Sequence, residues 1–197
     1  MTVLGNGLHD VLRHEDALSV EEANLAMIRR LGDAEENILA TQSNLATSYS
    51  MTGRDEAALR LRQEVYSGYL RLLGEEDIDS VEEAGNYAAT LKNLDRFKEA
   101  KSLLRKSIPV ARRIIGYGHI FTLRMRWIYG EALYMDPDAT LDDLREAVTM
   151  LEETERVARR VLGGAHPLTG GIVRHLRKAR AALGARETPS TPPLGSV

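Results

Sequence analysis

The feature that most constrains the fold of this chain is a dipeptide that recurs at nearly constant spacing. An aliphatic residue followed by glycine occurs as Leu31-Gly32, Leu73-Gly74, Ile115-Gly116 and Leu162-Gly163. The four glycines are separated by 42, 42 and 47 residues. Self-similarity with a period of about 20 to 50 residues is typical of stacked supersecondary units that pack on their neighbours. The sequence therefore predicts a repeat protein, and repeat proteins present extended surfaces that usually bind other molecules.

Composition favours helices as the repeated units. Aromatic residues make up only 5% of the 197 residues, while alanine, leucine, arginine and glutamate are abundant. This profile is typical of helices packed through small and aliphatic side chains. The chain has no cysteine, which excludes disulfides, thiolate zinc sites and cysteine nucleophiles.

Charge and hydropathy leave a soluble protein as the expectation. The net charge of −3 gives no preference for nucleic acid or for a membrane surface, so we expect neither as a partner. No apolar run approaches the roughly 20 residues that span a bilayer, and the first residues do not have the pattern of a signal peptide. We therefore expect a cytoplasmic location.

Each period is predicted to contain two helices. The expected pairs are 38–51 with 55–73, 80–93 with 97–115, and 121–134 with a helix that ends near residue 162, followed by a single helix over 168–183. Asp55 is a candidate N-cap, and Ser80 with Glu83 has capping-box spacing. Extra residues at 136–140 account for the 47-residue step.

The repeats divide the chain into consecutive segments. We expect an N-terminal half-repeat or cap helix over 1–31, repeats over 32–74, 75–116 and 117–163, and a C-terminal capping helix over 164–184. The remaining segment, 185–197, is rich in proline, serine and threonine and is predicted to be disordered.

Motifs inside the repeats resemble those of a known family. The chain contains Leu162-Gly163-Gly164-Ala165-His166-Pro167-Leu168-Thr169, then Asn44-Leu45-Ala46 in the first unit and Glu99-Ala100 in the second. These residues resemble the tetratricopeptide repeat in the 42-residue variant found in kinesin light chains. The resemblance implies an all-α fold, a right-handed α-solenoid of antiparallel helix pairs. It also implies a concave groove lined by the first helix of each pair.

The resemblance places a peptide-binding groove on these first helices. In the family, the asparagine of Asn-Leu-Ala hydrogen-bonds a bound peptide, a role that falls here on Asn44 and Asn86 because an amide both donates and accepts. The other predicted groove residues are Ser43, Thr47, Lys92, Arg124, Trp127, Ile128, Glu131, Arg174, His175 and Lys178. Several of these are basic, so an acidic peptide would suit the groove, although an ordinary solvated helix face gives the same pattern.

No catalytic or cofactor motif accompanies the repeats. The five histidines lack metal-site spacing, and no glycine-rich phosphate loop or nucleophile elbow occurs. We expect no metal, no cofactor and no enzymatic activity. Three hypotheses remain: an adaptor that holds a linear peptide or a partner segment, a structural module that self-assembles through its end repeats as a homo-oligomer, and a regulatory fragment of a larger protein.

Overall fold

The computed structural model describes residues 3–188, with side chains described from Glu15 onward, and within this range it contains helices and no strand. The helices are α1 (Val3–Leu31), α2 (Glu35–Met51), α3 (Asp55–Leu72), α4 (Ile78–Asn93), α5 (Phe97–Ile114), α6 (Ile120–Met135), α7 (Leu141–Leu162) and α8 (Pro167–Glu187). The fold is an α-solenoid, as the sequence predicts. No helix in the described range is long and apolar enough to cross a membrane.

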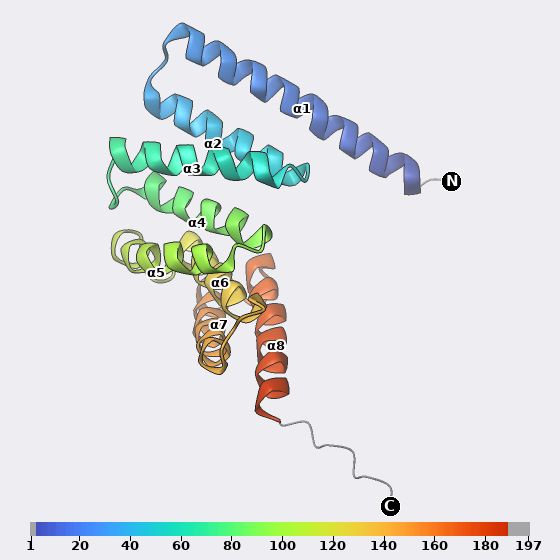
Figure 1. The fold of residues 1–197 in the computed structure, drawn as a ribbon, viewed down its shortest axis with the longest axis vertical. Helices are drawn as coiled ribbons and strands as arrows, with labels where there is room; N and C mark the ends of the chain where they lie inside the picture. Colours follow the sequence, from blue (N-terminus) through green and yellow to red (C-terminus); the bar gives the residue numbers. More distant parts are fainter. Residues whose placement is uncertain (1–2, 189–197) are drawn as a thin grey trace, which may run out of the picture.

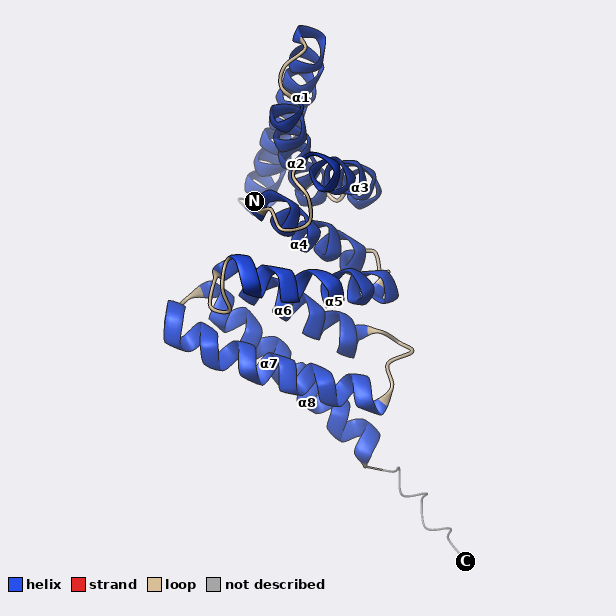
Figure 2. Cartoon of the chain, turned by 90° about the vertical axis from the view of Figure 1, so that its left-hand side faces the viewer, coloured by secondary structure: helices blue, strands red, loops and turns tan. Residues whose placement is uncertain are grey.

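The helices stack in chain order along the long axis of the molecule (Figure 1). Each helix packs on the next, and α4 and α6, and α6 and α8, also contact each other directly. Helix α1 lies at one end of the stack and α7 and α8 at the other (Figure 2). The first helices α4, α6 and α8 are therefore neighbours in space, although 42 and 47 residues separate their equivalent positions in the sequence.

The recurring glycines end the second helix of each pair. Gly32, Gly74, Gly116 and Gly163 have φ angles of 69°, 87°, 94° and 87°. This left-handed region is open to glycine but strained for other residues, which explains why the repeat carries glycine at this point.

The N-termini of α3 and α4 differ from the predicted N-cap at Asp55 and the predicted capping box of Ser80 with Glu83. Asp55 is the first residue of α3 and Arg54 is its N-cap, without a side-chain cap bond. Ser80 and Glu83 do not form a capping box either, because Asp77 caps α4 by accepting a hydrogen bond from the Asp79 amide. The histidines at the position equivalent to Asp77, His119 and His166, cap α6 and α8 in the same way.

The largest core cluster runs from α4 to α8 and includes Val81, Leu104, Leu123, Leu151 and Ile172. Smaller clusters hold α1 to α2 and α2 to α3.

The predicted C-terminal boundary is too early. The sequence predicts disorder from residue 185, but α8 continues to Glu187. Ala185, Arg186 and Glu187 are all good helix formers, and the first residue that cannot continue a helix is Pro189. Residues 189–197 lie outside the described residues.

Candidate interaction face

Side chains from α2, α3, α4, α6 and α8 meet in two polar clusters that join one helix pair to the next. The Arg62 cluster consists of Ser43, Thr47, Arg62 and Glu83, and the Glu131 cluster consists of Lys92, Glu131, Tyr134 and His175. The predicted groove residues lie on α2, α4, α6 and α8, and we call the side of the stack that these four helices form the first-helix face. Some of them are exposed on it, while others bind each other.

The Arg62 cluster connects α2, α3 and α4. The Arg62 guanidinium donates to both Glu83 carboxylate oxygens at 3.2 and 3.0 Å, to Ser43 Oγ at 2.8 Å and to Thr47 Oγ1 at 2.6 Å. Ser43 Oγ also donates to Glu83 at 2.7 Å. The Arg62 and Glu83 side chains are only 5% and 2% exposed. Because the carboxylate accepts from both α2 and α3, it fixes the first repeat onto the second.

Burial dominates the protonation of Glu83. Loss of hydration raises the pKa of Glu83 above its usual value, although the Arg62 charge and hydrogen bonds from Ser43, Arg62 and Asn86 act in the opposite direction. The carboxylate is therefore a group that folding makes harder to ionise.

The Glu131 cluster connects α4, α6 and α8. Lys92 Nζ lies 3.2 Å from Glu131 Oε2, and His175 Nδ1 lies 2.8 Å from Glu131 Oε1 and 2.8 Å from Tyr134 Oη. Burial lowers the pKa of His175, with Glu131 opposing the shift and the nearby cations reinforcing it. Burial, aided by Glu131, raises the pKa of Tyr134 to about 12. Glu131 thus pairs with the Lys92 ammonium and serves the packing of three helices.

Two asparagines and three cations remain accessible on this face. Asn44 is exposed and Asn86 is half-buried. Arg124, Arg174 and Lys178 are exposed on α6 and α8. Loss of hydration lowers the pKa of Arg124, and repulsion from Arg62 adds to the shift, although Glu82 and Glu83 oppose it.

Two predicted groove residues serve mainly as packing. Ile128 is 4% exposed within the main core, so the prediction that it lines the groove is wrong; the α6 backbone turns it toward the core. Trp127 is half-buried and packs on α8, where its ring lies so close to Gly171 that a Cβ there would be 2.6 Å from Trp127 Cη2. The Trp127 ring also meets His175 edge-on, with centroids 5.5 Å apart.

Sequence reasoning missed Arg62 and assigned Glu83 to a helix cap. A signal for Arg62 was present, because it stands in the apolar stripe of α3 formed by Ala58, Val65 and Tyr69. A charged residue in such a stripe needs a buried partner. The acidic partner of Arg62 depends on how α3 packs on α4. The sequence of either helix alone does not predict that packing.

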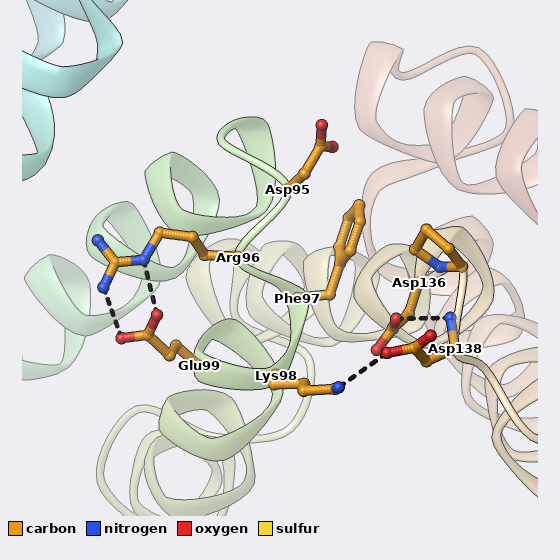
Figure 3. A pocket seen from close by; sticks show the side chains of 8 residues that line it. Asp95, Arg96, Phe97, Lys98, Glu99, Asp136 and Asp138 are labelled. Carbon is orange, nitrogen blue, oxygen red and sulfur yellow. Dashed lines mark hydrogen bonds and ion pairs between the residues drawn. The ribbon is translucent and has the colours of Figure 1, made fainter.

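A pocket of about 340 Å³ lies elsewhere, between the α4–α5 turn and the 136–138 segment before α7 (Figure 3). Four of its charged side chains form two pairs: Arg96 contacts Glu99 at 2.6 and 2.8 Å, and Lys98 contacts Asp138 at 2.8 Å (Figure 3). The Lys98–Asp138 pair is largely exposed, whereas a mostly buried pair, Lys101 with Asp136 at 2.9 Å, links the insertion to α5. The described residues contain no group of three or more histidine, cysteine or acidic side chains placed to hold a metal.

Comparison with known proteins agrees with the repeat architecture. The tetratricopeptide repeat family matches residues 38–79 and 84–120. No curated protein sequence matches the chain.

Solved structures share the fold at low sequence identity. Two crystal structures of nearly identical TPR-like repeats of a putative kinesin light chain from Podospora anserina, one of them a point variant, have TM-scores of 0.75 and 0.73. Both are 20% identical over 93% of this chain and 85% of theirs. The crystal structure of BtubC (BKLC) from P. vanneervenii has a TM-score of 0.60 at 15% identity, covering 94% of this chain and 79% of that one. With the stacked helix pairs, these findings show that the matched segments within residues 38–120 are tetratricopeptide repeats and that the fold is that of kinesin-light-chain-like repeats.

Proposed function

We propose that the chain is a non-catalytic interaction scaffold that binds a linear peptide along the first-helix face. Tetratricopeptide repeats indicate a protein-interaction or scaffold role, and these repeat families are generally non-catalytic. One observation carries the proposal further. Side chains link α2 to α4, α4 to α6 and α6 to α8, which supports placing the exposed residues of these helices on one surface.

The chemistry of the exposed residues suits an acidic extended peptide. The Asn44 amide can pair with peptide N–H and C=O groups, which an extended backbone leaves free. Asn86, whose amide also hydrogen-bonds Glu83, can offer a peptide its remaining donor and acceptor. Arg124, Arg174 and Lys178 provide positive charge at the α6–α8 end, while the nearby Glu131 is already paired with Lys92. Charge complementarity of this kind favours acidic partners and increases the association rate.

Peptide selection tests the proposal. We expect the wild-type chain to enrich short acidic motifs from a peptide array or phage library, and the Asn44→Ala/Asn86→Ala double variant to lose that enrichment. Reversing Arg124, Arg174 and Lys178 to glutamate should weaken binding and remove its salt dependence. As a control, Arg156→Glu/Arg160→Glu on α7 should leave binding unchanged. Equal enrichment by wild type and by both face variants would contradict the proposal.

A second candidate function is self-assembly through α1. Val20, Met27 and Leu31 are 69%, 52% and 71% exposed, and their spacing places them on one side of this helix. Asp16 and Arg30 flank this stripe, and an antiparallel pairing of two α1 helices would place the acid of one copy near the arginine of the other. We propose a second copy of the chain as the occupant of this stripe.

Sedimentation velocity over a range of concentrations tests the assembly. The wild-type chain is expected to show a concentration-dependent increase in mass, which Val20→Glu/Met27→Glu should abolish while leaving the helix content unchanged. Val161→Glu, which changes another exposed apolar residue on α7, provides the matched control. A wild-type chain that stays monomeric at all concentrations would overturn this candidate.

A further inference from the structure

A second pocket, away from the first-helix face, lies between α3, α4 and α5. Its volume is about 330 Å³, at the lower end of the range for small-molecule sites. The pocket is lined by Tyr66, Leu70, Glu75, Ser80, Val81, Ala84, Lys106, Ser107 and Val110. None of these residues belongs to the proposed peptide site.

The equivalent positions in the first and third units show which side chains fill this space there. The 42- and 47-residue steps give Ala84 the equivalents Gln42 and Arg126, and Lys106 the equivalents Glu64 and Glu153. In the first unit, Gln42 Nε2 donates to Glu64 Oε2 at 3.2 Å. In the third unit, Arg126 Nη2 donates to Glu153 Oε2 at 2.8 Å. In both units, therefore, a donor on the first helix bridges to a glutamate on the following second helix.

The third unit is filled more completely. The Arg126 guanidinium lies 4.3 Å from the ring centroid of Tyr117, and Tyr117 Oη donates to Glu153 at 3.2 Å. Tyr117 is the equivalent of Glu75. A cation stacked on an aromatic ring and paired with a carboxylate thus occupies the space that is open in the second unit.

The second unit lacks this bridge, and at the position of the accepting glutamate it has a residue of opposite charge. Ala84 is too short to reach α5, and a lysine stands where the other units have the accepting glutamate. Among the described residues, Lys106 takes part in no ion pair. The Ser80 hydroxyl, on a residue only 2% exposed, also has no hydrogen-bond partner in this part of the chain.

We propose that this pocket binds a small carboxylic acid with an apolar stem. The stem would lie against Leu70, Val81 and Val110, and the ligand carboxylate would pair with the Lys106 ammonium. The ligand would thus supply the carboxylate that Glu64 and Glu153 provide in the other two units. The Ser80 hydroxyl is a second donor available in the pocket. Glu75 is the one other charged residue that lines the pocket. Because its carboxylate would repel a second negative charge, a ligand with one carboxylate is favoured over a ligand with two.

Three probes that differ only in their end group test the inference: hexanoate, hexanol and hexylamine, titrated into the isotope-labelled full chain and followed by NMR chemical shifts. Hexanoate is expected to bind most tightly, with shifts centred on α3, α4 and α5. Lys106→Glu, an exposed substitution, should weaken hexanoate binding by about fivefold and make hexylamine the preferred probe. Glu75→Gln should tighten hexanoate binding. Lys98→Glu, which lies on the same helix outside the pocket, should change nothing.

Rebuilding the missing bridge gives an independent test. The double variant Ala84→Gln/Lys106→Glu copies the Gln42–Glu64 pair and is expected to abolish binding of all three probes while the helix content stays constant. The inference is overturned if hexanoate binds no more tightly than hexanol, or if the Lys106→Glu chain keeps the wild-type order of preference. Because no predicted peptide-binding residue is changed, these outcomes are separate from those of the peptide selection.

Discussion

Replacing Arg62 with alanine is expected to destabilise the chain by about 3–5 kcal/mol, the cost of leaving a buried charge without its partner. The Glu83 carboxylate would lose both guanidinium bonds and would keep only neutral donors such as Ser43 Oγ. Urea unfolding followed by circular dichroism measures the change. For a chain of this length, the melting temperature should fall by on the order of 10 °C.

Two further variants separate the buried pair from ordinary surface charge. Arg71→Ala removes the partner of Glu35 in a pair that is 68% and 49% exposed, and should cost about 0–1 kcal/mol. Arg62→Met/Glu83→Leu replaces both buried charges with apolar groups of similar size and should cost much less than Arg62→Ala, because no unpaired charge remains. An Arg62→Ala variant as stable as Arg71→Ala would contradict the role assigned to the cluster.

The raised pKa of Glu83 predicts a pH dependence of stability. Since burial makes the folded-state pKa higher than the unfolded one, the folded chain binds more protons between the two values. The contribution of this group to stability is therefore fully present below the unfolded pKa, near the ordinary glutamate value, and is lost as pH rises through the folded pKa. Glu83→Gln should flatten this part of the curve of unfolding free energy against pH. A curve of unchanged slope in the variant would show that other groups are responsible.

The repeat made the fold predictable from the sequence. The glycine spacing located the helix ends, because a left-handed residue is a local requirement that the sequence shows directly. The contacts of α4 with α6 and of α6 with α8 also follow from the repeat, because the period relates these first helices to one another. The binding face on these helices stays a prediction. The partners within the face were not predictable. Glu83 looked like part of a helix cap because capping boxes and buried ion pairs use the same residue types, and only the packing of α3 on α4 distinguishes them.

The two adjacent glycines of α8 also show that local sequence does not predict tertiary contacts. Gly170 and Gly171 are adjacent in the sequence, yet a Cβ on Gly170 would meet nothing within 4 Å, whereas a Cβ on Gly171 would lie 2.6 and 2.9 Å from the Trp127 ring. Both are helical, so local sequence treats them alike. Tertiary packing gives them opposite roles.

The two alanine substitutions are therefore expected to have effects of opposite sign. Gly170→Ala should stabilise the chain by about 0.5–1 kcal/mol, because alanine loses less conformational freedom than glycine in a helix. Gly171→Ala should destabilise it by about 1–3 kcal/mol, because the added methyl group forces the indole or the α8 backbone to move. Thermal melts compare the two variants directly, and the fluorescence of Trp127, the one tryptophan in the chain, should shift in Gly171→Ala and stay constant in Gly170→Ala.

A second substitution decides whether the Trp127 contact is the cause. In a Trp127→Phe background the smaller ring leaves room for a methyl group, so Gly171→Ala should lose most of its destabilising effect there. If Gly171→Ala costs the same with phenylalanine as with tryptophan, the close approach of α6 and α8 does not depend on this ring. If the cost disappears, Trp127 holds α8 against α6 and thereby fixes the positions of Arg174, His175 and Lys178 on the first-helix face. The aromatic residue would then support the proposed peptide site by placing its cations, in addition to any contact of its own with the peptide.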